Sequence, residues 1–139
     1  ASRAQLVQQA IRPALASGAV VLCDRFYDSS LAYQGYGRGL DLAKVQHAID
    51  LAVGETKPDI TLLLDIPLEV STERVANRQS KTGESIDQFD RSGDTFFKRV
   101  LDGFQALAKG EPGRFRVVDG TLSPDAVAQT VWECVVPLL

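Results

Sequence analysis

Three short apolar segments constrain the fold of this chain most strongly. They cover residues 19–23, the stretch DITLLLDI over residues 59–66, and RFRVVDG over residues 114–120. The first two have strand length and are apolar on both faces, and helical patterns separate all three along the chain. Strands of this kind that alternate with helices predict an α/β fold, with a parallel sheet covered by helices on both sides.

Between these strands, apolar residues recur at helical spacing. The spacing predicts helices over residues 2–16, 42–53, 67–77 and 97–108, and a last helix that begins at Ser123-Pro124. Pro13 removes one backbone donor, which predicts a kink near Ile11. Asp41 can cap the second helix, which should end at Gly54. Residues 78–91 have no apolar periodicity, and we expect them to form a polar loop.

Length and charge limit the class of protein. With 139 residues the chain is long enough for one domain with a core, so a single domain is expected over residues 1–139. The net charge of −3 predicts no broad attraction to nucleic acid or to an anionic membrane, so any anion site must be local. Cys23 and Cys134 lie in apolar runs without metal-ligand spacing, and we expect buried thiols in a reducing, cytoplasmic compartment.

Each predicted strand ends in an aspartate, namely Asp24, Asp65 and Asp119. Ligands of open parallel sheets bind beyond the carboxyl ends of the strands, although aspartate is also common in ordinary turns. Asp24 differs from the other two because Arg25 follows it at once. A carboxylate that holds a cation, beside a guanidinium that holds a phosphate, is what phosphoryl transfer requires. For this dipeptide alone, a surface ion pair is the plain alternative.

The segment after Arg25 is predicted to be a loop that lines a ligand site. It combines three tyrosines, short polar side chains and glycines, namely Tyr27, Tyr33, Tyr36, Ser29, Ser30, Gln34, Gly35, Gly37 and Gly39. Aromatic faces with short hydrogen-bonding groups suit a nucleobase and its sugar. The glycines would let the backbone approach a ligand closely.

The stretch CDRFYDSSLAYQGYGRGLD resembles the Asp-Arg-aromatic motif and following segment of bacterial thymidylate kinases. The resemblance extends to ASRAQLVQQAIRPAL, PDITLLLDIPLEVSTERVANR and RFRVVDGTLSPDAV. It implies a P-loop-kinase-like parallel sheet flanked by helices, and transfer of the γ-phosphate of ATP to dTMP to give dTDP. It further implies Mg²⁺ as cofactor with ATP, and a homodimer. From the net charge, we expect no nucleic-acid or membrane partner.

The same resemblance implies roles for individual residues. On the dTMP side, Asp24 would help to hold Mg²⁺ and Arg25 would grip the dTMP phosphate. Arg3 would bond a thymine carbonyl, Ser30 and Gln34 would contact thymine, and Tyr33 would pack against the deoxyribose. On the ATP side, Arg74 would lie over adenine, with Gly120 and Thr121 on the other side of the ring and Arg78 as a further candidate.

The chain departs from the family pattern in two ways. It contains no G-x-x-x-x-G-K-[ST] phosphate loop, which lies further upstream in the family. We therefore expect a carboxy-terminal part of a longer protein, without the first strand and phosphate loop, and inactive by itself. In the lid, Gln88 stands where an arginine is common. Arg78, Lys81 and Arg91 could replace that arginine, or could belong to an ordinary solvated loop.

Two other functions remain open from the sequence. A deoxynucleoside kinase also carries an acidic residue and an arginine at a strand end, but its acceptor has no phosphate for Arg25 to bind. A degenerate nucleotide-binding or structural protein would have lost the phosphate loop. An upstream gene sequence that encodes such a loop after an apolar strand would exclude the second alternative.

Overall fold

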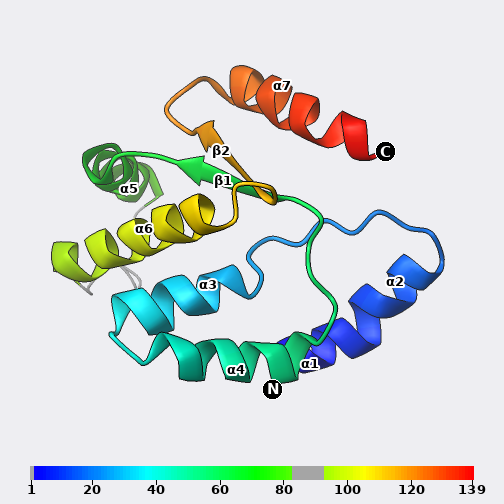
Figure 1. Ribbon diagram of the computed structural model, residues 1–139. Coiled ribbons are helices and arrows are strands. Elements are labelled where there is room, and N and C mark those ends of the chain that lie inside the picture. Colours follow the sequence, from blue (N-terminus) through cyan, green and yellow to red (C-terminus); the bar gives the residue numbers. More distant parts are fainter. Residues whose placement is uncertain (1, 83–92) are drawn as a thin grey trace. The chain divides into compact units, whose positions relative to one another are not determined.

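The computed structural model describes residues 2–82 and 93–139 (Figure 1). By their contacts, the described residues form two compact units. Unit 1 contains the chain up to Pro58 together with Arg99–Leu107, and unit 2 contains the rest of the described chain. The single domain over residues 1–139 stays a prediction, and each unit is described below by itself.

Unit 1 begins with an irregular helix. It consists of α1 (Ser2–Leu6), a π-helical segment η1 (Val7–Ile11) and α2 (Arg12–Ala16). The Arg12 N–H donates to the Val7 carbonyl, which is a π-type bond. The next residue, Pro13, has no N–H to donate to the preceding turn, and π-bulges are a common response to such a break. The hydrogen bonding thus changes next to Ile11, where a kink or break was predicted, and the bend itself stays a prediction.

The predicted first strand over residues 19–23 is wrong, because this segment forms no strand in the described chain. Val20 is 75% exposed and Leu22 is 93% exposed, whereas Val21 and Cys23 are half-buried. The segment therefore keeps the alternation of a strand but has no paired neighbour among the described residues. A strand exists only through hydrogen bonds to another strand, which the residues of the segment cannot supply alone.

The loop predicted after Arg25 is also wrong, because most of this segment is helical. It forms α3 (Asp28–Ser30) and a π-helical continuation, η2 (Leu31–Gly37). Its glycines misled the prediction, since Gly35 serves packing within unit 1. A β-carbon at Gly35 would collide with the Leu42 side chain. Buried Leu31 and Ala32 give this helical segment its apolar side.

Helix α4 (Leu42–Val53) follows the predicted boundaries. The Asp41 carboxylate accepts hydrogen bonds from the backbone N–H groups of Ala43 and Lys44, at 2.9 and 3.3 Å. These donors have no partner within the helix, so the aspartate satisfies them. At the other end, Gly54 has a φ of 56°, a backbone conformation that suits glycine.

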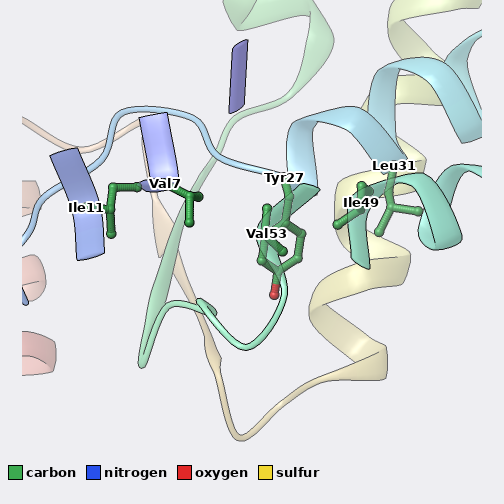
Figure 2. Close-up of a cluster of buried hydrophobic side chains, with 6 residues drawn as sticks. All are labelled: Val7, Ile11, Tyr27, Leu31, Ile49 and Val53. Atoms are coloured by element: carbon green, nitrogen blue, oxygen red, sulfur yellow. The ribbon is translucent and has the colours of Figure 1, made fainter. Parts of the chain in front are cut away.

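The core of unit 1 joins these helices (Figure 2). It consists of Val7, Ile11, Tyr27, Leu31, Ile49 and Val53, with Leu107 packed against it. Leu107 belongs to α6 (Gly93–Gly110), whose apolar side was predicted from the sequence. Arg99 Nε of the same helix donates to the Gly37 carbonyl at 2.9 Å. The core and this bond hold the segment that follows Arg25.

Unit 2 contains the parallel strands β1 (Thr61–Asp65) and β2 (Phe115–Asp119), which lie side by side in Figure 1. The helices α5 (Leu68–Thr82) and α7 (Pro124–Val135) follow these strands, and a short η3 (Val136–Leu138) ends the chain. Two of the three predicted strands, their parallel direction and the α/β class are thus confirmed. None of the described helices is both long enough and apolar enough to cross a membrane.

Helix α5 extends five residues beyond the predicted end, so the loop prediction is wrong for residues 78–82. Arginine, glutamine and lysine favour helices even where no apolar face exists, which periodicity does not detect. The rest of the predicted loop, residues 83–91, lies outside the described residues.

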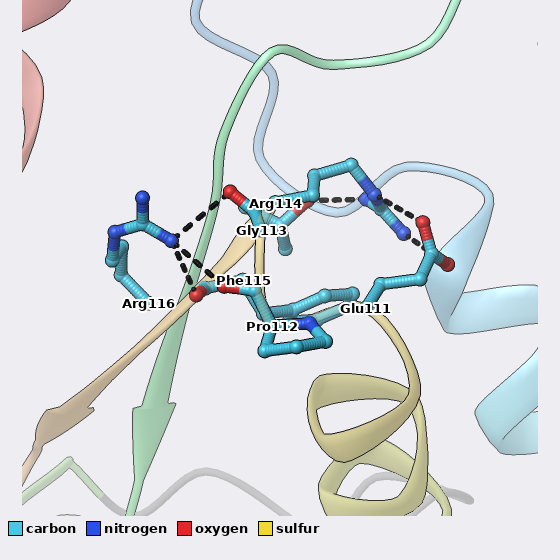
Figure 3. Close-up of polar contacts among 7 residues, drawn as sticks. Glu111, Pro112, Gly113, Arg114, Phe115 and Arg116 are labelled. Carbon is cyan, nitrogen blue, oxygen red and sulfur yellow. Dashed lines mark hydrogen bonds and ion pairs between the residues drawn. The ribbon is translucent and has the colours of Figure 1, made fainter.

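Two arginines fix the turn that leads from α6 into β2 (Figure 3). Arg114 forms a two-pronged ion pair with Glu111, at 2.9 and 3.0 Å, and its Nη1 donates to Thr61 Oγ1 at 2.6 Å. Arg116 Nη1 lies 2.9–3.1 Å from the carbonyls of Pro112, Gly113 and Phe115. Because Thr61 begins β1, these bonds help to set the register of the two strands.

The cap of α4 gives a testable prediction of stability. Asp41→Ala leaves two backbone donors without their acceptor, so the free energy of unfolding should fall by about 1 kcal/mol. Asp50→Ala is the matched control, because Asp50 only accepts from Gln46 on the exposed side of the same helix. Denaturant unfolding of the full-length protein measures both. If both substitutions lowered the free energy of unfolding equally, the cap would contribute no more stability than an exposed side-chain hydrogen bond.

Candidate functional site

Two arginines of unit 1 converge on one helical segment. Arg3, on α1, donates a hydrogen bond from Nη1 to Ser30 Oγ at the end of α3, 27 residues away in sequence. Arg25 precedes the same segment, and its Nε donates to Ser29 Oγ at 3.4 Å. Neighbouring serines therefore each accept from one guanidinium. We call Arg3, Arg25, Ser29, Ser30 and Tyr33 the arginine cluster.

Arg25 has an unusual backbone conformation for a non-glycine residue. Its φ is 62°, and no other described non-glycine residue has a positive φ. A conformation of this kind costs on the order of 1–3 kcal/mol and persists where the surroundings impose it, often at functional sites. The guanidinium lies over the ring of Tyr33, with Cζ 4.7 Å from the ring centroid. A hydroxyl and an aromatic face thus hold the side chain.

The chemistry of the arginine cluster suits a phosphorylated ligand. A guanidinium offers donors in a planar fork that matches phosphate oxygens. Arg25 is exposed, so the donors that Ser29 does not use can reach a ligand. Ser29 is only 6% exposed, and its position inside unit 1 makes it a support of the arginine.

The other predicted dTMP-side residues lie next to the arginine cluster in the sequence. Gln34 follows Tyr33 on η2 and is half-buried. Asp24 directly precedes Arg25 and is exposed, and its carboxylate has no hydrogen-bond partner among the described residues. The structure gives one direct contact between Arg3 and Ser30 and another between Arg25 and Tyr33, and it gives no such contact for Asp24 or Gln34.

Asp24 is compatible with a magnesium site that is completed by a ligand. Mg²⁺ is commonly held by one or two carboxylates together with substrate phosphates and water. Among the described residues, no group of three or more His, Cys, Asp or Glu side chains could hold a metal by itself. The Asp24 carboxylate, which is exposed and has no partner among the described residues, fits a Mg²⁺ ion held mainly by substrate phosphates and water.

The predicted ATP-side residues lie in unit 2, at the carboxyl ends of the two strands. Asp65 and Asp119 end β1 and β2 and are neighbours in register. The Gly120 N–H donates to the Asp65 carbonyl at 2.9 Å, and Arg74 Nη1 donates to the Gly120 carbonyl at 2.9 Å. A β-carbon at Gly120 would lie 2.6 Å from Ile66 Cγ2, so this close approach requires glycine.

Thr121 completes this turn by binding Asp119. Its hydroxyl and its backbone N–H donate to Asp119 Oδ1, at 2.6 and 2.8 Å. The hydroxyl, followed by the backbone bond, lowers the pKa of the Asp119 carboxyl below its ordinary value. Gly120 and Thr121 thus belong to one turn, to which the Arg74 side chain of α5 is bonded. The side chain of Arg78 lies outside the described residues, as do those of Lys81, Gln88 and Arg91.

Sequence reasoning missed the part that Ser29 takes in the site. Ser29 follows Arg25 by four residues. In a helix this spacing predicts contact between two side chains, but in the loop that was expected here it predicts nothing. It also missed Phe104 of α6, whose ring lies 6.4 Å from that of Tyr33. Contacts so distant in sequence leave no local signal.

The chain is similar over most or all of its length to proteins of one family. The family model for thymidylate kinase matches residues 1–131. A thymidylate kinase of Solidesulfovibrio magneticus is 47% identical over 100% of this chain and 68% of its own length. One of Geobacter sulfurreducens is 48% identical over 94% of this chain and 62% of its own length. One of Synechococcus sp. is 47% identical over 100% of this chain and 64% of its own length.

Parallel strands with flanking helices, together with this match, define an α/β protein of the P-loop-kinase type. Within that class, the chain belongs to the thymidylate kinase family. The predicted fold class and family resemblance are thereby confirmed. The chain spans between 62% and 68% of the length of these three relatives.

The Asp119–Thr121 bond predicts a pH dependence. Because folding lowers the pKa of Asp119, the ionised carboxylate stabilises the folded state above the unfolded pKa, and this contribution is lost as pH falls through the folded pKa. Thr121→Val removes the hydroxyl but keeps the backbone donor, so the pKa of Asp119 should rise toward its ordinary value. NMR titration of the carboxyl carbon measures this shift.

Thr130→Val is the matched control, since the Thr130 hydroxyl donates to the Ala126 carbonyl within α7. It should leave the Asp119 titration unchanged. An unaltered Asp119 pKa in Thr121→Val would contradict the assignment of the shift to the Thr121 hydroxyl.

Proposed function

We propose that the full-length protein transfers the γ-phosphate of ATP to dTMP and forms dTDP. The observation that carries this proposal is the mounting of Arg25, which has an unfavourable backbone conformation and is held by a hydroxyl and an aromatic ring. The bond between Arg3 and Ser30 lies in the same cluster and supports a second recognition point. The family and the names of the relatives support the choice of dTMP.

On the acceptor side, Arg25 binds the dTMP phosphate with its planar fork. Arg3 bonds a thymine carbonyl, and Ser30 and Gln34 contact the edge of the base. Tyr33 packs against the deoxyribose. An acceptor without a phosphate would give Arg25 no partner, so this arrangement favours a nucleotide over a nucleoside as the acceptor.

The reaction is an in-line displacement in which a dTMP phosphate oxygen attacks the γ-phosphorus and ADP leaves. The attacking oxygen is already anionic, so no protein side chain needs to remove a proton. Catalysis then consists of positioning and of charge neutralisation, with Arg25 on the acceptor phosphate. Asp24 would help to hold Mg²⁺, which supplies positive charge to the phosphates when bound.

On the donor side, Arg74 packs over the adenine, with Gly120 and Thr121 forming the turn at the other side of the ring. Arg78 is a further ATP-side residue. The proposal includes a cytoplasmic homodimer, with no nucleic-acid or membrane partner. An arginine or lysine of the segment around residues 78–91 would neutralise the transferring phosphate in place of Gln88.

Arg25→Lys tests the role of the guanidinium fork. The substitution keeps the positive charge but loses the paired planar donors, so turnover should fall by on the order of a hundredfold if about 2.7 kcal/mol of stabilisation is lost. Steady-state kinetics of the full-length protein with ATP, Mg²⁺ and dTMP give kcat and both KM values. Circular dichroism verifies the fold.

Arg12→Lys is the matched control for this substitution. Arg12 is also an arginine of unit 1, but its guanidinium donates to Thr56 Oγ1 and to the Val53 carbonyl. Turnover of the control should stay close to that of the parent protein. A folded Arg25→Lys variant as fast as the parent would reduce Arg25 to an ordinary surface cation and would contradict the proposal.

A further inference from the structure

Phe104 connects α6 to the arginine cluster through one aromatic contact. Its ring centroid lies 6.4 Å from that of Tyr33, and the two ring planes meet at 79°. This edge-to-face geometry is a favourable arrangement for an aromatic pair. Tyr33 in turn carries the Arg25 guanidinium on its face, 4.7 Å from the ring centroid. Three side chains from separate segments of unit 1 thus form a continuous row.

The part of α6 that holds Phe104 is firmly attached within unit 1. Arg99 donates to the Gly37 carbonyl at the end of η2. A β-carbon at Gly103 would lie 2.7 Å from Tyr36 Cβ, so the helix backbone directly contacts this side chain of η2. Leu107 packs against the core. Phe104 therefore presents its ring to Tyr33 from a backbone that has little freedom to move.

Arg25 depends strongly on the orientation of the Tyr33 ring. Its bond to Ser29 is long, at 3.4 Å, and alone would leave the outer part of the guanidinium free to swing. The aromatic face adds a second support, which acts only while the ring keeps its orientation. Phe104 restricts rotation of that ring, since a rotated Tyr33 would lose the edge-to-face contact.

From this row of contacts we infer that Phe104 is a positioning residue for Arg25 and acts through the Tyr33 ring. The inference rests on the proposed function, in which Arg25 binds the acceptor phosphate. Phe104 itself touches no substrate in this account. By fixing the Tyr33 ring, Phe104 limits the orientations of the Arg25 guanidinium before the phosphate binds. Binding then costs less side-chain entropy.

The test compares the affinities of dTMP and thymidine, because only dTMP carries the phosphate. Titration calorimetry of the full-length protein gives both dissociation constants. Phe104→Leu keeps apolar volume but loses the ring, so the preference for dTMP over thymidine should fall by about two- to tenfold. Phe104→Tyr keeps the ring and should retain the preference.

Phe97→Leu is the matched control on the same helix. The Phe97 ring also lies edge-to-face with a neighbour, but that neighbour is Phe96, at 5.5 Å, and not a residue of the arginine cluster. The preference for dTMP should remain unchanged in this variant. Circular dichroism and thermal unfolding of all variants identify any general loss of structure.

A second background separates positioning from general stability. In Arg25→Ala the phosphate has lost its partner, so Phe104→Leu should no longer alter the preference for dTMP. An equal loss in both backgrounds, or no loss in the parent, would overturn the inference while leaving the proposed function intact. If the single variant Arg25→Ala kept the parent protein's preference for dTMP over thymidine, Arg25 would not bind the phosphate. That result would overturn the proposed function as well.

Discussion

The interaction on which the rest of this site depends is the support of Arg25 by Ser29 and Tyr33. The arginine has a positive φ, a conformation that non-glycine residues adopt only at a cost. A hydrogen bond to a buried serine and a stacked tyrosine compensate for that cost and direct the guanidinium. The helical segment α3–η2 carries both supports, so its placement decides where the Arg25 guanidinium lies.

That placement follows from the packing of unit 1. Tyr27 and Leu31 anchor the segment to the core, and Arg99 fixes its far end through the Gly37 carbonyl. At the same time, Arg3 reaches Ser30 from α1. Three kinds of contact therefore hold this one short helical segment. They are its buried side chains, the bond from the Arg99 side chain to a backbone carbonyl, and the hydrogen bond from Arg3. A rigid mount of this kind limits the ordering that must accompany substrate binding.

The sequence predicted the parts of the fold that are encoded locally. The cap by Asp41 and the change in hydrogen bonding near Ile11 follow from neighbouring residues, and apolar runs of strand length located β1 and β2. The strand over residues 19–23 was predicted wrongly, because pairing depends on a distant partner. The helix after Arg25 was missed because glycines such as Gly35 signal turns locally but serve packing here. The contact between Arg25 and Tyr33 could not be predicted, because it depends on that helix.

A crystal structure of the full-length protein with dTMP would test the central claim most directly, namely that Arg25 is preset to hold the acceptor phosphate. The guanidinium should then lie within hydrogen-bond distance of the phosphate oxygens, about 2.7–2.9 Å. Arg25 should keep its positive φ and its place over Tyr33. A phosphate bound elsewhere, with Arg25 turned toward solvent, would contradict the account.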